Sequence, residues 1–325
     1  MNILIFAQLF RSMSIFFAAF SLVVLSNLTV GMANESNPHS SSESQFKEKL
    51  ARAMTGDPVA QHLVADAYMD GNGVPKDLRR AFGWYEAAAM QGNPDSEFNV
   101  GRAYEHGDGV EVNYKLALKW YTRAAEEGSV QAQNNLAHMY MDAKGTESDY
   151  DLALKLLRAA ADKEHPTALN SLGHVYSKGI GVPKNDALSF EYYKRAADKG
   201  LDIAYFNVGS FYFDGDRGKQ QDFHSAKVWY EKAAAQGVLQ AYYLLGWMYG
   251  EGKLGKPNAV LAYALTNVAA SENGERILEI AQYREQLRKR MTQDQVKEAQ
   301  ILSNSLATPN TFNTAYRKYA SGSRH

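Results

Sequence analysis

Residues 57–92 read DPVAQHLVADAYMDGNGVPKDLRRAFGWYEAAAMQG, and the pattern of this stretch recurs five more times along the chain. Numbered from the residue after a recurring glycine, the six units are 57–92, 93–128, 129–164, 165–200, 201–237 and 238–273. Position 12 is a tyrosine in every unit, position 9 is Ala or Gly, and an Ala-Ala pair stands near each end. A period of 36 residues, with one extra residue in the fifth unit, indicates a solenoid in which each unit contacts its neighbours.

Each unit is predicted to form two antiparallel helices, because apolar residues stand at positions 4, 8, 11 and 12 and again at 25, 28, 29 and 32. In the first unit, Gly56 suits a left-handed helix end, Asp57 suits an N-cap and Pro58 suits the first helical position. The glycines at 71 and 73 mark the loop between the helices. The predicted fold class is therefore all-α, an α/α solenoid forming a right-handed superhelix.

The two ends differ from the repeats. Residues 14–30 are almost wholly apolar and are followed by Gly31 and Ala33, so residues 1–33 are predicted to be a secretory signal peptide cleaved after Ala33. An uncleaved membrane anchor is the alternative; after cleavage we expect no stable membrane span. The Ser-rich segment 34–45 is expected to be a flexible linker.

Capping helices are predicted beside the array. Residues 46–56 match only the second helix of a unit and are expected to cover the first repeat. Residues 274–306 are expected to form C-terminal capping helices, the last of which opens with the capping box Thr292–Gln295. The tail, 307–325, is expected to be frayed.

Composition excludes several classes of function. The formal net charge is −1, so no strong field exists to attract nucleic acid or an anionic membrane. The chain has no cysteine, which excludes disulfides, thiolate catalysis and zinc–cysteine sites. We expect no cofactor, no metal and no catalytic residue, since no phosphate loop, His-Glu-x-x-His motif or nucleophile elbow is present.

The repeat closely resembles the Sel-one-like repeat, a longer-looped relative of the tetratricopeptide repeat. The residues that carry the resemblance are Ala60, Tyr68, Gly71-Asn-Gly73-Val74-Pro-Lys, Trp84-Tyr85 and Ala88-Ala89, and the same pattern runs from Ala168 to Lys184. The third unit departs from it, with Ala143 for the first loop glycine and Leu156-Leu157 for the aromatic pair. The resemblance implies a non-catalytic scaffold that binds proteins, often in export, signalling or host interaction.

Positions 6, 10 and 13 of the first helices point away from the predicted core, because each residue turns the helix by about 100°. In tetratricopeptide-like stacks this side lines the concave groove. The partner-binding candidates on this side are Phe206, Phe213, Tyr243 and Trp247 in the last two units and Phe98, Arg102 and Glu105 in the second. The alternatives are that the C-terminal helices bury these aromatics or that they form a subunit interface.

Two weaker patterns are interpreted as structural. His138 and His174 share a column and are expected to be solvated surface residues, since a third metal ligand is lacking. Asp214-Gly-Asp216 lacks the glycine and the acid that a calcium loop requires. The sequence therefore favours an exported, periplasmic or secreted scaffold that binds a protein or peptide. The alternative is an envelope protein that binds or hydrolyses cell-wall glycan or β-lactams.

Overall fold

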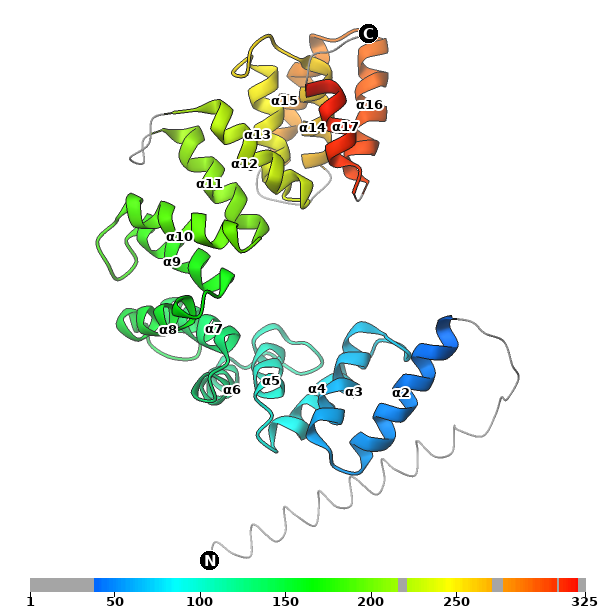
Figure 1. The fold of residues 1–325 in the computed structure, drawn as a ribbon, viewed down its shortest axis with the longest axis vertical. Helices are drawn as coiled ribbons and strands as arrows, with labels where there is room; N and C mark the ends of the chain where they lie inside the picture. The colour runs from blue at the N-terminus through cyan, green and yellow to red at the C-terminus, as the bar shows by residue number, and fades with distance from the viewer. Residues whose placement is uncertain (1–37, 216–220, 271–276, 309, 321–325) are drawn as a thin grey trace, which may run out of the picture.

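The computed structural model describes residues 38–215, 221–270, 277–308 and 310–320. Helices follow one another along a curved path instead of gathering around one centre (Figure 1). The first helices of the six repeats, called A helices, are α3 (Pro58–Asp70), α5 (Pro94–His106), α7 (Val130–Met141), α9 (Pro166–Lys178), α11 (Asp202–Asp214) and α13 (Leu239–Gly250). The second, or B, helices are α4 (Leu78–Ala89), α6 (Tyr114–Glu126), α8 (Tyr150–Asp162), α10 (Asp186–Asp198), α12 (Phe223–Ala235) and α14 (Ala259–Ala269). The predicted all-α solenoid is confirmed.

The boundaries of the helices follow the predicted signals. The side chain of Asp57 accepts hydrogen bonds from the backbone N–H groups of Val59 and Ala60, and Pro58 takes the first helical position. The glycines that end the B helices adopt φ between 81° and 93°. A left-handed residue at a helix end frees the chain to turn into the next helix.

Within a repeat, the small residue at position 9 lets the A and B helices approach closely. A Cβ atom built on Gly173 would lie 2.7 Å from Cδ1 of Tyr193, which is closer than real Cβ contacts allow. Gly101 and Gly209 stand in the same relation to Tyr121 and Tyr230. In these repeats the tyrosine ring of the B helix therefore packs directly against the backbone of the A helix of the same repeat.

Between repeats, the tyrosine at position 12 packs on the preceding B helix. The rings of Tyr104 and Phe82 lie edge to face at 5.3 Å, and those of Tyr212 and Phe190 at 5.8 Å. These contacts join repeat 2 to repeat 1 and repeat 5 to repeat 4, so the apolar stripe continues across these junctions.

The loop between the helices is also in contact with the preceding repeat. Gly145 adopts φ 76°, and a Cβ atom on it would lie 2.6 Å from the backbone carbonyl carbon of Tyr114. The loop glycine is thus needed both for its backbone conformation and for the close approach of two backbones. In the same repeat Ala143 replaces the first loop glycine and still adopts a positive φ of 54°.

The N-terminal cap is longer than expected. Helix α2 (Pro38–Met54) begins at Pro38, so the prediction of a flexible linker is wrong for residues 38–45. Phe46 of α2 is buried and meets Tyr68 edge to face at 5.4 Å, which is the contact that a B helix makes with the following tyrosine. The proposed signal peptide, 1–33, lies outside the described residues. None of the described helices is long and apolar enough to span a membrane.

In the described part of the chain after the last repeat, three helices follow: α15 (Ile277–Lys289), α16 (Gln293–Ala307) and α17 (Phe312–Ala320). The predicted capping box is present at the start of α16, between Thr292 and Gln295. The expectation of a frayed tail is wrong for residues 312–320, because they form α17 and its Phe312 and Tyr316 are buried. The hydroxyl groups of Tyr316 and Tyr249 lie 2.8 Å apart, so α17 covers the last position-12 tyrosine.

Candidate functional site

Positions 6, 10 and 13 of the A helices are called here the A-helix face; most of their residues are partly or fully exposed, whereas Asn134, Tyr243 and Gly250 are buried. Hydrogen bonds join neighbouring A helices across it. Nδ1 of His62 lies 2.8 Å from Oγ of Ser96, the hydroxyl of Ser171 donates to Oδ1 of Asn134, and the amide of Asn207 donates to Oδ1 of Asn170. A ligand lying along this face would therefore contact several repeats at once.

Five rings form an aromatic cluster on repeats 5 and 6: Phe206, Phe213, Phe223, Tyr230 and Trp247. Phe213 is central to it. Its ring centroid lies 5.4 Å from that of Trp247, 5.5 Å from that of Phe223 and 6.1 Å from that of Tyr230. Phe206 lies 5.5 Å from Tyr230.

The structure brings together three of the four aromatics predicted for these repeats. Tyr230 of the cluster is fully buried and supports the other rings, whereas Phe206, Phe213, Phe223 and Trp247 are half-buried. Phe223 was missed from the sequence, because it opens a B helix instead of standing in an A-helix column.

Lys253 adds a positive charge to the cluster. Its Nζ lies 5.5 Å from the ring centroid of Trp247 and 5.7 Å from that of Phe223, and its side chain is exposed. An ammonium group at this distance from an aromatic ring is held by the negative face of the ring. The cluster therefore combines apolar surface with a localised cation.

Tyr243 does not belong to the exposed surface. It is 7% exposed, its hydroxyl donates to Oε1 of Glu279 at 2.9 Å, and its ring lies 6.3 Å from that of Tyr283. Glu279 and Tyr283 belong to α15. A C-terminal helix therefore buries Tyr243, as the first alternative predicted. The ring contacts of Phe213 and Trp247, in contrast, are made within repeats 5 and 6.

The three candidates of repeat 2 have different surroundings. Phe98 packs on Tyr121, with ring centroids 5.7 Å apart. Glu105 accepts hydrogen bonds from the hydroxyl of Tyr121 at 2.9 Å and from Nζ of Lys144 at 3.3 Å, and its side chain is only 10% exposed. Glu105 therefore stabilises the A-helix face from within, while half-buried Arg102 lies on the face beside it.

Burial raises the pKa of the Tyr85 and Tyr121 hydroxyls, and the carboxylates that accept hydrogen bonds from these hydroxyls raise it further. These carboxylates are Asp66, 2.6 Å from the Tyr85 hydroxyl, and Glu105. The positive charge of Arg102 lowers the pKa of both hydroxyls and so opposes part of this shift.

His138 is not the solvated residue that the sequence suggested. It is half-buried, and its Nε2 lies 2.9 Å from Oγ of Ser171. Burial lowers its pKa, and the positive charge of His174 lowers it further, whereas Asp142 raises it. His174 itself is exposed. Within the described residues, no group of three His, Cys, Asp or Glu side chains could hold a metal ion.

Ser96, His62 and Asp66 are arranged like a hydrolytic triad. The imidazole of His62 lies 2.8 Å from the Ser96 hydroxyl and 3.5 Å from Oδ2 of Asp66. Ser96, however, is fully buried in the contact between two A helices. A nucleophile must reach its substrate, so this arrangement serves packing and not hydrolysis.

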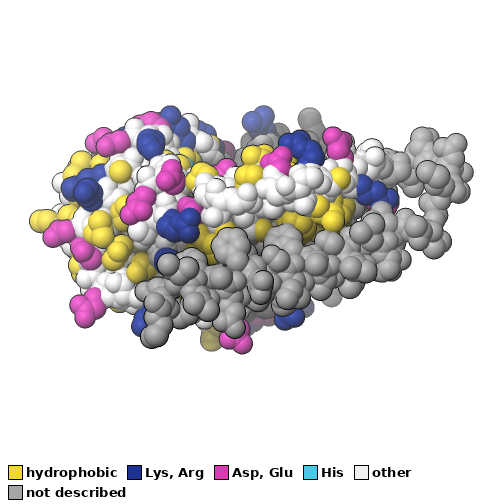
Figure 2. Space-filling model, turned by 90° about the horizontal axis from the view of Figure 1, so that it is seen from below, with side chains coloured by type: hydrophobic (Ala, Val, Ile, Leu, Met, Phe, Trp, Pro, Cys, Tyr) yellow, Lys and Arg dark blue, Asp and Glu magenta, His cyan; other side chains and the backbone are white. Residues whose placement is uncertain are grey.

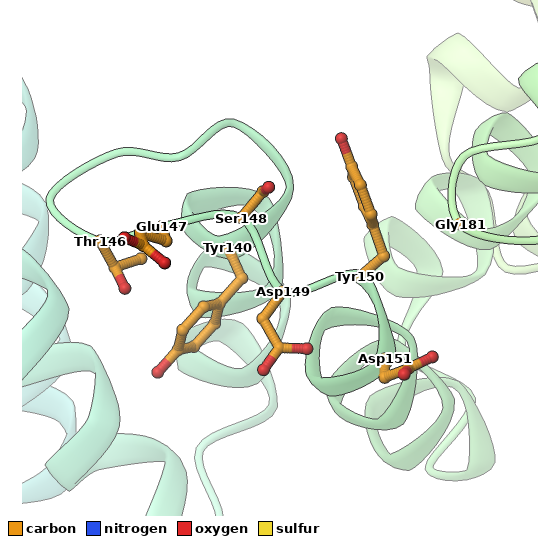
Figure 3. A pocket seen from close by; sticks show the side chains of 8 residues that line it. All are labelled: Tyr140, Thr146, Glu147, Ser148, Asp149, Tyr150, Asp151 and Gly181. Atoms are coloured by element: carbon orange, nitrogen blue, oxygen red, sulfur yellow. The ribbon is translucent and has the colours of Figure 1, made fainter.

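An open cavity of about 500 Å³ lies at the edge of the array between repeats 3 and 4. It is lined by Tyr140, Gly181 and residues 146–151. Figure 3 shows the ring of Tyr150 pointing away from the side chains of Tyr140 and Asp149. Asp149 accepts a hydrogen bond from the backbone N–H of Leu152 at 2.9 Å, so this carboxylate caps α8.

The charged side chains on the face drawn in Figure 2 are mixed, with Lys and Arg interspersed among Asp and Glu. This agrees with the formal net charge of −1. A mixed surface does not attract polyanions over a distance, so recognition depends on local contacts.

Comparison with known proteins identifies the repeat. The Sel1 repeat family matches residues 58–93, 94–129, 130–165, 166–201, 202–238 and 239–274. A Sel1 repeat protein from Oxalobacter formigenes is 30% identical, with a TM-score of 0.65 over 72% of this chain and 93% of that one. A protective antigen of uropathogenic Escherichia coli with an SLR fold is 25% identical, with a TM-score of 0.37 over 87% of this chain and 75% of that one. A search of curated proteins found no match. With six matched repeats that cover most of its length, the chain belongs to the Sel1 repeat family.

Proposed function

We propose that this protein is an exported, non-catalytic scaffold that binds a protein or peptide partner on the A-helix face, with the aromatic cluster of repeats 5 and 6 as the anchor. Sel1 repeat proteins are generally scaffolds for protein interaction. The observation that carries the proposal is the contact between Phe213 and Trp247, which joins two repeats through half-buried rings.

Physical chemistry favours such a cluster as an anchor. Aromatic residues contribute much of the binding energy at protein interfaces, because they bury a large apolar area and lose little rotational freedom. Phe213 and Trp247 are already held against Phe223 and Tyr230 before any partner binds. A preordered anchor reduces the entropic cost of binding.

The test is capture of a partner by the immobilised protein from an extract of the producing cells. The double variant Phe213→Ala/Trp247→Ala is compared with Met90→Ala/Val228→Ala, which removes two exposed apolar side chains from B-helix regions outside the cluster. We expect the wild type and the control variant to retain one protein in stoichiometric amount, and the cluster variant to lose it.

Circular dichroism must show the same helix content in all three proteins. Equal retention by the cluster variant and the wild type would refute the proposed site. If the cluster variant unfolds, Trp247→Leu, which keeps an apolar side chain, takes its place in the comparison.

Export is part of the proposal and has its own test. Expression of the whole chain with a C-terminal tag, followed by fractionation and N-terminal sequencing, should give a protein that begins at Asn34 outside the cytoplasm. A product that still begins at Met1 in the membrane fraction would support an anchor instead.

A further inference from the structure

The charged groups of the A-helix face differ in how they are paired. Among the described residues at positions 6, 10 and 13, the carboxylates are Asp66 and Glu105. Asp66 accepts a hydrogen bond from the hydroxyl of Tyr85 at 2.6 Å and faces His62 at 3.5 Å. Glu105 is occupied by Tyr121 and Lys144. Both anions of the face therefore have partners within the protein.

The cations of this surface are different. Within the part of the chain that the structure describes, the side chain of Arg102 has no hydrogen bond and no ion pair, although it is half-buried. The ammonium group of Lys253 lies over the rings of Trp247 and Phe223 and has no ion pair with a carboxylate of the described residues. A half-buried guanidinium without a partner loses hydration and gains nothing in return, so an external anion would stabilise it.

We infer that the partner of the A-helix face is an acidic segment that carries an apolar or aromatic side chain beside a carboxylate. This inference rests on the proposed function and specifies the chemistry of the partner. The apolar side chain would pack on Phe213 and Trp247, and the neighbouring carboxylate would pair with Lys253. A second carboxylate of the same segment would pair with Arg102.

Charge complementarity decides against a basic segment. A basic side chain at the cluster would face the ammonium group of Lys253. At repeats 1 and 2 it would find the carboxylates of Asp66 and Glu105 already hydrogen-bonded within the protein. Asp70 adds an acidic group at the end of α3, at the edge of the face beside Asp66. The acidic segment is therefore placed from Arg102 toward repeat 6, away from repeat 1.

The experiment uses phage that display random peptides of about 15 residues, and it selects the peptides that bind the full-length chain. We expect the enriched peptides to contain more Asp and Glu than the unselected library, next to Phe, Leu or Trp. The selected peptide is then synthesised, and its affinity is measured by fluorescence anisotropy for the wild type, Arg102→Gln, Lys253→Gln and the control Lys155→Gln. Lys155 is an exposed residue of α8 outside the A-helix face.

Each of the two cation variants should weaken binding about fivefold, as loss of a partly exposed ion pair predicts, while Lys155→Gln should leave it unchanged. Raising the ionic strength should weaken binding to the wild type more than binding to either cation variant. Selected peptides without acidic enrichment, or equal affinity of the cation variants and the wild type, would overturn the inference. If peptides without acidic enrichment still need Phe213 and Trp247 for binding, only the inference fails and the proposed function stands. If the peptides bind the Phe213→Ala/Trp247→Ala variant as well as the wild type, the proposed binding site itself is refuted.

Discussion

Replacing Gly173 by alanine tests whether the close approach of the A and B helices determines the stability of a repeat. The added Cβ would lie 2.7 Å from Cδ1, 2.8 Å from Cε1 and 2.9 Å from Cγ of Tyr193, which is itself buried. Overpacking of this kind costs about 1–3 kcal/mol, and the better helix propensity of alanine returns about 1 kcal/mol. We expect a net loss of up to about 2 kcal/mol in the free energy of unfolding.

Gly83 provides the matched control. It also lies inside a helix, α4, but a Cβ atom on it would meet nothing within 4 Å. Gly83→Ala should therefore gain the propensity term without a steric cost and stabilise the protein by about 1 kcal/mol. The two variants contain the same chemical change and are expected to shift stability in opposite directions.

The assay is urea unfolding followed by far-ultraviolet circular dichroism, with the midpoint compared at a common slope. A double variant, Gly173→Ala/Tyr193→Leu, recreates the pair that repeat 3 forms with Ala137 and Leu157 and should recover part of the loss. In repeat 1, Ala65 and Tyr85 occupy the positions that Gly173 and Tyr193 occupy in repeat 4, so the fold accepts an alanine there. We therefore expect the loss of unfolding free energy in Gly173→Ala to lie in the lower half of its range. If Gly173→Ala stabilises the protein as Gly83→Ala does, the steric argument is refuted.

Three further predictions concern stability. Ala143→Gly should raise the melting temperature, because alanine at φ 54° costs about 1 kcal/mol that glycine avoids; an unchanged melting temperature would contradict this. Phe312→Ala should cost about 3 kcal/mol in urea unfolding and make α17 sensitive to proteolysis, since this buried ring stacks on Tyr316 at 5.1 Å; wild-type resistance to protease would show that α17 does not depend on it. Burial lowers the pKa of His138 and His165 below the ordinary 6.5, so the unfolded chain binds more protons than the folded one as the pH falls through 6.5. Stability should therefore decrease from pH 7.5 downward and level off below the folded pKa values, with a smaller decrease for His138→Gln; stability that rises on acidification would contradict the assignment.

The repeated core could be predicted from the sequence because its signals are local and occur six times. Position 12 and the Ala pair identify helices, and Asp57 and Pro58 identify a helix start through backbone chemistry that needs no distant partner. The ends lacked this redundancy. Helix α17 is held by the contact of Tyr316 with Tyr249, which lies 67 residues earlier. The repeat pattern of the sequence does not predict that contact.

The candidate site was predictable only in part, for a related physical reason. The position of a residue in the repeat indicates that its side chain points away from the core. It does not show whether another helix covers that side chain. Tyr243 occupies the same column as Phe206 and is nevertheless covered by α15. Phe223 joins the aromatic cluster from outside the columns, and His138 is held by Ser171 of the next repeat. Such contacts depend on neighbouring units rather than on the pattern of one unit.

The contact of the Gly145 loop with the start of α6 has a consequence for how this array can change in length. The loop of one unit abuts the backbone of the unit before it, so an inserted residue at that point would push two neighbours apart. Duplication or excision of an entire 36-residue module leaves every such junction intact. Lengthening by whole modules is thus the variation that the architecture tolerates best, and it alters how much partner surface the protein can span without redesigning any single contact.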